Sequence, residues 1–203
     1  RLEPDNLALL EVAGKAQLDS KQPKLAIPTY ERLVVKAPKS IDAHLYLAQS
    51  AMMGGQPDKA KTALDALIKL DPEHRAGMLM RAQLALKDRD LDTTAALLAR
   101  LEQSGVTGAS IERLRAGVAT LQKNPEAALN ALTKLLTIEA STMNLRLLTD
   151  MQLGTGKLED AIVTLNSWLE KHPTDQVARI KLGGIFLQLK QCSSSYKLEQ
   201  SAA

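Results

Sequence analysis

Three prolines, Pro4, Pro38 and Pro72, stand 34 residues apart, and this spacing limits the possible folds more than any other feature of the chain. Small and large apolar residues recur at fixed offsets between them. A period of this length is typical of repeat proteins, in which each unit buries its apolar face against its neighbours. We therefore expect one elongated stack of units in place of one or two compact domains.

Each unit is predicted to be a pair of helices. Leu7, Leu10, Ala13 and Gly14 recur at intervals of three, three and one residues, which predicts the apolar face of an amphipathic helix. The polar segment 19–23 interrupts this pattern, a second apolar stripe passes through Tyr30, and Pro38 ends it. Aromatic residues make up only 2% of the chain, so leucine and alanine, which favour helices, must fill the core. These features predict an all-α fold.

The predicted repeats cover about residues 5–38, 39–72, 73–106, 107–140 and 141–173, with a partial sixth repeat at 174–191. The distance from Pro72 to Pro173 is one residue short of three periods, so we place a single deletion between Ala140 and Leu145. After Gln191 the pattern ends. We expect residues 192–203 to form an irregular tail, either a frayed end or a vector-derived segment, with a folded capping helix as the alternative. The chain starts without Met, so we expect it to be cut from a longer protein.

These units resemble tetratricopeptide repeats. That family has a small residue midway along its first helix, a small residue early in its second, a large apolar residue four places later, and a closing proline. The matching residues here are Gly14, Ala48, Ala82, Ala116 and Gly183; Ala26, Ala60, Ala128 and Ala161; Tyr30, Leu64, Leu98, Leu132 and Leu165; and Pro4, Pro38, Pro72 and Pro173. The third repeat departs from the pattern, with Thr94 at its second small position. The resemblance implies a right-handed superhelical solenoid of antiparallel helix pairs with a concave groove lined by the first helices.

Composition and motifs argue against several functions. The net charge of +3 comes from interleaved basic and acidic residues, and stacking aromatics are scarce, which disfavours nucleic-acid binding. No apolar stretch is long enough for a membrane span. The single Cys192 excludes an internal disulfide.

No catalytic motif is present, and we expect neither enzyme activity nor a cofactor. Three dispersed histidines, His44, His74 and His172, lack metal-ligand spacing. The run Asp88, Asp90, Asp92 lacks the glycine and glutamate of a calcium loop, so a turn between helices is the better interpretation.

The resemblance also identifies groove residues. The candidates for the partner-binding groove are Leu45, Gln49, Met52, Met53, Leu79, Gln83, Leu86, Arg113, Arg146 and Asp150. The same positions elsewhere hold Glu11, Lys15, Asp19, Thr120, Ile180, Leu187 and Gln188. One family subset binds the acidic C-terminus of chaperones with a Lys/Asn/Arg clamp. The corresponding places here hold Glu11, Lys15, Tyr46, Ala76 and Met80, so that clamp is absent.

We interpret the chain as a non-catalytic scaffold that binds a helix or peptide of a partner protein in its groove. The segments 148–154 and 168–173 also resemble bacterial tetratricopeptide lipoproteins of exosortase-linked exopolysaccharide systems. That resemblance implies a periplasmic or outer-membrane place in export or assembly, although the sequence leaves the compartment open. The alternative function is the substrate-recruiting arm of a larger enzyme. Self-association through exposed end repeats is a third hypothesis.

Overall fold

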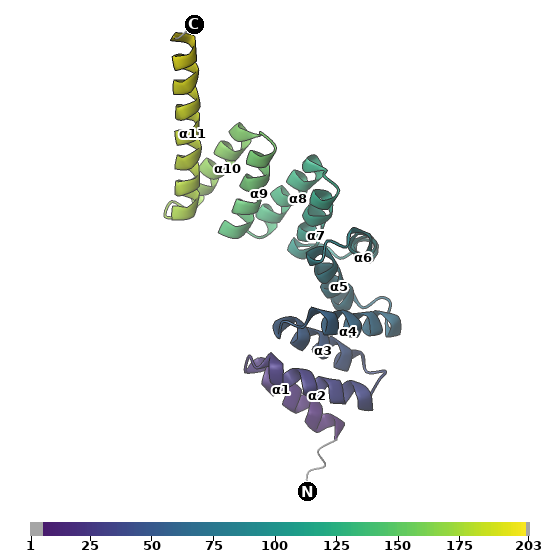
Figure 1. Cartoon of the computed structure of the whole chain (residues 1–203). Coiled ribbons are helices and arrows are strands. Elements are labelled where there is room, and N and C mark those ends of the chain that lie inside the picture. Colours follow the sequence, from purple (N-terminus) through teal and green to yellow (C-terminus); the bar gives the residue numbers. More distant parts are fainter. Residues whose placement is uncertain (1–5, 202–203) are drawn as a thin grey trace. The chain divides into compact units, whose positions relative to one another are not determined.

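Residues 6–201 form eleven consecutive helices, and the all-α prediction is confirmed (Figure 1). A computed structural model describes the backbone of residues 6–201 and the side chains of residues 6–189. Within this described part there is no β-strand, and no helix is long and apolar enough to cross a membrane. The chain divides into two compact units, residues 1–106 and 107–203. The prediction of one continuous array over residues 1–191 stays a prediction.

The first unit holds six helices in three antiparallel pairs, in which each helix packs on the next one along the chain. They are α1 (Leu7–Asp19), α2 (Pro23–Lys36), α3 (Ile41–Met53), α4 (Pro57–Leu70), α5 (Arg75–Lys87) and α6 (Leu91–Gln103). Proline opens α2 and α4, where its missing N–H is not needed for a helical hydrogen bond.

The second unit repeats this plan with two further pairs and a longer last helix. Its helices are α7 (Ala109–Leu121), α8 (Pro125–Ile138), α9 (Thr142–Gly154), α10 (Leu158–Lys171) and α11 (Gln176–Ser201). The sequence predicts an irregular segment from residue 192, but the structure continues α11 through Ser201. After Gly184 no glycine or proline is present to end the helix. Residues 202–203 lie outside the described part.

Helix caps reproduce the sequence period. The residues that precede the first helix of each pair are Asn6, Ser40, His74, Gly108, Ser141 and Asp175. Their spacing is 34 residues except for the step from Gly108 to Ser141, which is 33. The loop between α8 and α9 covers only residues 139–141, whereas the corresponding loops cover 37–40 and 71–74. The predicted one-residue deletion therefore falls at the Ala140–Ser141 edge of the predicted interval.

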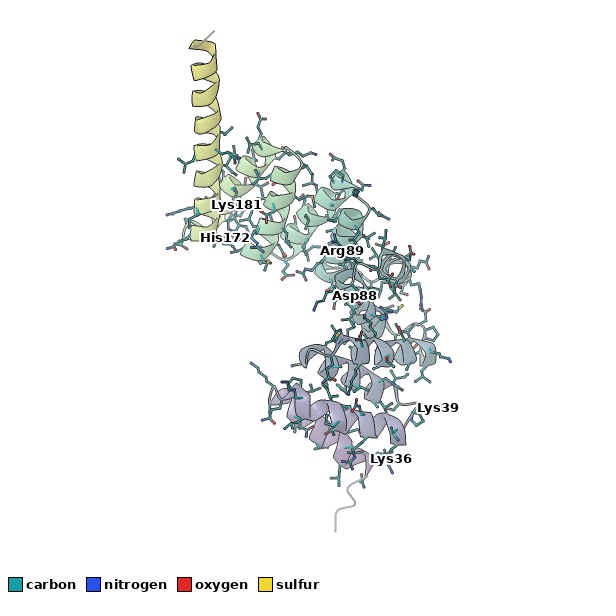
Figure 2. All side chains as sticks on the ribbon, in the orientation of Figure 1. Lys36, Lys39, Asp88, Arg89, His172 and Lys181 are labelled. Carbon is teal, nitrogen blue, oxygen red and sulfur yellow. The ribbon has the colours of Figure 1, made fainter. Side chains whose placement is uncertain are left out.

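The turn inside each pair also has a fixed conformation. One residue per turn adopts positive φ, and these residues are Lys21, Gly55, Arg89, Lys123 and Gly156. Figure 2 labels Arg89 beside Asp88 in the turn between α5 and α6. Only Gly55 and Gly156 adopt this conformation without a steric cost, because they lack a Cβ atom.

Buried small and large residues hold each pair together. Ala26, Ala60, Ala128 and Ala161 are fully buried at the second small position. Thr94 occupies that position in the third repeat and is also fully buried. Its hydroxyl donates to the Asp90 carbonyl at 2.6 Å, so the polar atom is satisfied inside the core. The third repeat thus departs from the sequence pattern while keeping the packing of the others.

Candidate functional site

The first helices of the pairs in unit 1 present a half-exposed apolar face. In α3 the predicted groove residues Leu45, Gln49, Met52 and Met53 follow the i, i+4, i+7, i+8 spacing that places side chains on one side of a helix. Leu45, Gln49 and Met52 are half-buried, and Met53 is 57% exposed. Met52 packs against the core of the unit. Flexible methionines at such a face suit contact with apolar groups of varied shape.

The α5 helix carries the corresponding residues of the third repeat. Leu79 and Leu86 are half-buried, and Gln83 is exposed between them along the helix. Met80, one residue from Leu79, packs against the same core cluster as Met52. The face defined by Leu45, Met52, Met53, Leu79 and Leu86 is called the apolar groove face below. On each of the two helices a neutral glutamine, Gln49 or Gln83, lies between the apolar residues, and the position of Met53 is Lys87 in α5.

A cavity of about 260 Å³ lies at the α1 side of this face. It is called the α1–α3 pocket here, because its lining comes from α1 and α3, which are called its two walls, and from two residues of α2. Its lining consists of Glu11, Val12 and Lys15 of α1, Tyr30 and Leu33 of α2, and Asp42, Ala43 and Tyr46 of α3. The pocket is therefore an aromatic and aliphatic hollow with charged groups on both walls.

Tyr30 is a buried aromatic residue of the pocket lining. It is fully buried, and its ring stacks on Tyr46 with centroids 5.5 Å apart. Its hydroxyl has no hydrogen-bond partner among the described residues. Burial, with smaller contributions from Tyr46, Asp19 and Glu11, raises the pKa of Tyr30 to about 12. Tyr30 is thus a neutral phenol at physiological pH.

Sequence reasoning identified Glu11 and Lys15 as groove residues and missed Asp42. Asp42 is exposed in the first turn of α3, where the negative charge is also favourable for the helix dipole. Because this role in the helix explains Asp42 in the sequence, its place in the lining of the pocket was not predicted. Its distance of one helical turn before Tyr46 is the signal that could have found it.

The predicted groove charges of unit 2 are engaged within the protein. Arg113 Nη2 lies 3.1 Å from Glu139 Oε2 and 3.4 Å from Asn144 Oδ1. Lys181 of α11, labelled in Figure 2, pairs with Asp150 of α9. Arg146 contacts the Met143 sulfur at 3.9 Å. These side chains connect α7 with the α8–α9 loop and with α9, and α9 with α11. A partner would have to compete with these contacts.

The other predicted groove positions give no second site. Asp19, Gln188 and Thr120 are exposed, and the Thr120 hydroxyl donates to the Ala116 carbonyl at 2.7 Å. Ile180 and Leu187 are 75% and 65% exposed on α11. The places of the chaperone clamp hold Glu11, Lys15, Tyr46, Ala76 and Met80, which together supply only one cation.

The histidines and the aspartate run have structural contacts. His44 Nε2 lies 3.0 Å from the Pro38 carbonyl, which fixes it as the donor. His74 Nδ1 accepts from the Gly77 N–H at 3.0 Å and caps α5. His172 stacks on Trp168 with ring centroids 4.0 Å apart, in the turn labelled in Figure 2.

In the turn before α6, Asp88 pairs with Lys61 at 2.6 Å. Asp90 caps α6, and the Thr93 hydroxyl and N–H lower the pKa of its carboxyl. Throughout the described part, no three side chains that could hold a metal ion come together.

Residues 17–84 match the family model of the tetratricopeptide repeat. No curated protein sequence matches the chain. Among solved structures, TTC0263, a thermophilic tetratricopeptide-repeat (TPR) protein of Thermus thermophilus, has a TM-score of 0.63 and 18% identity, over 90% of this chain and 100% of that one. MamA from Desulfovibrio magneticus has a TM-score of 0.76 and 14% identity, over 87% and 99%. YrrB, a TPR protein described as having an unusual peptide-binding site, has a TM-score of 0.62 and 12% identity, over 79% and 84%.

Proposed function

Because residues 17–84 match the tetratricopeptide repeat family and the described chain has its fold, we propose that this protein is a non-catalytic scaffold that binds a peptide of a partner protein. The binding site in this proposal is the apolar groove face with the α1–α3 pocket beside it. The observation that carries the proposal is the run of half-exposed apolar side chains on the same positions of α3 and α5, beside a 260 Å³ pocket. Apolar anchors next to a pocket are the usual features of peptide grooves.

YrrB supports the proposal as a structural neighbour for which a peptide-binding site is named. Ligand chemistry differs between proteins of one fold, so the site must be argued from this chain's own residues. Here the apolar groove face favours leucine-like or methionine-like side chains of the ligand. Its two glutamines, Gln49 and Gln83, are neutral groups that can hydrogen-bond a peptide backbone.

The test is a selection of random twelve-residue peptides on the immobilised chain, followed by affinity measurement for the enriched sequences. The groove variant is Met53→Asp with Leu79→Ser, first shown by circular dichroism to keep its helix content. Val35→Asp is the matched control, because Val35 is an apolar residue of α2 in the same unit that is 77% exposed and lies outside the groove face.

We expect the selected peptides to bind the unmodified chain and the Val35→Asp control with similar affinity and to lose affinity for the groove variant. Placing a charge against an apolar ligand side chain leaves that charge desolvated without a partner. Equal affinity for all three proteins would overturn the groove assignment.

We further propose that the scaffold acts in bacterial exopolysaccharide export or assembly. The support is the resemblance of segments 148–154 and 168–173, which lie in α9 and at the end of α10. Capture of an exopolysaccharide-assembly protein by the unmodified chain, lost with the groove variant and kept with Val35→Asp, is the expected result. Deletion of the gene with no change in exopolysaccharide output would overturn it.

A further inference from the structure

The α1–α3 pocket carries unbalanced negative charge beside aromatic rings. Glu11 of α1 and Asp42 of α3 stand on its two walls, and Lys15 is the single cation in its lining. None of these three side chains forms an ion pair or hydrogen bond within the part of the chain that the structure describes. Glu11 and Lys15 are four residues apart, the spacing at which helical ion pairs form, yet their charges remain apart. Two carboxylates therefore line the pocket with no hydrogen-bond partner among the described residues.

Two further features near the pocket favour a cation. The carboxylate of Asp19 is close enough to help raise the Tyr30 pKa, as is that of Glu11. Tyr30, a fully buried residue of the pocket lining, has a hydroxyl with no hydrogen-bond partner among the described residues. Tyr46, half-buried and stacked on Tyr30, contributes a ring to the wall. Carboxylates together with an aromatic ring are a favourable environment for a cation.

We propose that the α1–α3 pocket binds an arginine side chain of the partner peptide. A planar guanidinium can lie against the Tyr46 ring while its N–H groups donate to the carboxylates of Glu11 from α1 and Asp42 from α3, which line the same pocket. This inference rests on the proposed function, since it names the side chain that the peptide places beside its apolar anchors. It also gives the site a charge preference opposite to that of a clamp for acidic C-termini.

The neighbouring repeat explains why the preference belongs to this pocket and not to the next one along unit 1. At the positions that correspond to Glu11, Lys15, Asp42 and Tyr46, one repeat later, the chain has Leu45, Gln49, Ala76 and Met80. The carboxylates and the ring are all replaced there by uncharged, mostly apolar groups. The expected ligand is thus a peptide with one arginine followed or preceded by apolar residues.

The experiment uses the peptides selected above and a double charge variant, Glu11→Gln with Asp42→Asn, which keeps side-chain size. Asp58→Asn with Asp92→Asn is the matched control, since both are exposed aspartates of unit 1 outside the pocket and the loss of charge is the same. Each selected peptide is also made with its arginine replaced by alanine and by lysine. Affinities are measured by titration calorimetry at low and high salt.

We expect arginine to be enriched among the selected peptides and the pocket variant to lose affinity by about tenfold or more, as hydrogen bonds to charged groups predict. The control variant should lose less than about threefold, as expected for screened exposed charges. The arginine-to-alanine peptide should bind the pocket variant and the unmodified chain equally. The lysine peptide should fall between, because an ammonium cannot span both walls as a guanidinium does.

The two proposals fail in different ways. Peptides that lose affinity for the Met53→Asp, Leu79→Ser variant but contain no basic residue, and are indifferent to Glu11→Gln with Asp42→Asn, would overturn the arginine pocket and leave the groove intact. Peptides indifferent to both variants, or no enrichment of any peptide, would overturn both.

Discussion

Replacing Gly14 by alanine should destabilise unit 1, because the added Cβ atom would clash with the Tyr30 ring. A Cβ atom at Gly14 would lie 2.6 Å from Cζ and 2.9 Å from Cε2 of Tyr30. The ring is fully buried and stacked on Tyr46, so it cannot move aside freely. Overpacking of this kind costs about 1–3 kcal/mol. Alanine is itself about 0.5–1 kcal/mol more favourable than glycine inside a helix, so the net loss is smaller than the clash.

Gly183→Ala is the control that isolates the clash. Gly183 holds the same repeat position in α11, but no atom lies within 4 Å of its added Cβ. The helix-propensity gain should then appear alone. Relative to Gly183→Ala, the Gly14→Ala variant should lose about 1–3 kcal/mol more of its free energy of unfolding. Urea denaturation followed by far-ultraviolet circular dichroism measures this loss for each variant.

A second substitution should rescue the first. The second repeat pairs Ala48 with Leu64, both fully buried, where the first repeat pairs Gly14 with Tyr30. Gly14→Ala combined with Tyr30→Leu should therefore lose less stability than the sum of the single changes, by about 1 kcal/mol or more. Additive losses, or equal effects of Gly14→Ala and Gly183→Ala, would refute the idea that the two positions are matched in size.

Ala60→Leu or Ala128→Leu should each cost about 1–3 kcal/mol by overpacking, since both alanines are fully buried between paired helices; an unchanged thermal melt for either would contradict this register. Arg89→Gly should raise Tm, because Arg89 adopts a φ of 61° at the position that Gly55 occupies in the preceding turn. A positive φ costs a residue other than glycine about 1–2 kcal/mol, and the conformational entropy of the new glycine offsets about 0.5–1 kcal/mol of the gain. A lower Tm would argue against strain at this turn. The Ala178 N–H, the Trp168 indole and the Thr142 hydroxyl donate hydrogen bonds that lower the pKa of Asp175. The ionised Asp175 therefore stabilises the folded state above its ordinary pKa of 3.8, and this stabilisation disappears as pH falls through the lowered pKa. Protonation of Asp175 should change the fluorescence of Trp168, and Asp175→Ala should remove this acid-dependent change. The variant should also lose about 0.5–2 kcal/mol of stability as a lost helix cap. An acid titration of Trp168 fluorescence that is the same in the variant would assign the effect to another group.

The helices were predictable because each repeat restates the same pattern of small and large residues. The one-residue deletion was visible as well, since it shifts Pro173 against the earlier prolines. Cross-helix polar pairs show what the pattern alone does not identify. The Thr29 hydroxyl donates to Gln17 at 2.9 Å, and at the same repeat positions Gln152 donates to Thr164 at 3.0 Å. In the second repeat the two positions hold Ala51 and Ala63, so both polar partners are replaced there by alanine.

The candidate site was predictable only in part, for physical reasons. Helical spacing places Leu45 and Met53 on one face, and the structure gives that face half-exposed side chains. Spacing cannot say which charges find partners in the next repeat, because ion pairing depends on the three-dimensional approach of flexible side chains. Asp150 and Arg113 are therefore engaged, while Asp42 lies on a pocket wall with no ion pair to any described residue.

Methionine methyl groups provide the most direct test of the central claim, that peptides bind the groove of unit 1. The chain has six methionines: Met52 and Met53 belong to the apolar groove face, Met80 adjoins its residue Leu79, Met78 lies in the core of the same unit, and Met143 and Met151 lie in unit 2. With carbon-13 labelled methyls, titration of a selected peptide is followed residue by residue in nuclear magnetic resonance spectra. The account predicts the largest shifts at Met52, Met53 and Met80. Saturable binding that shifts only Met143 and Met151, or none of the six, would contradict it.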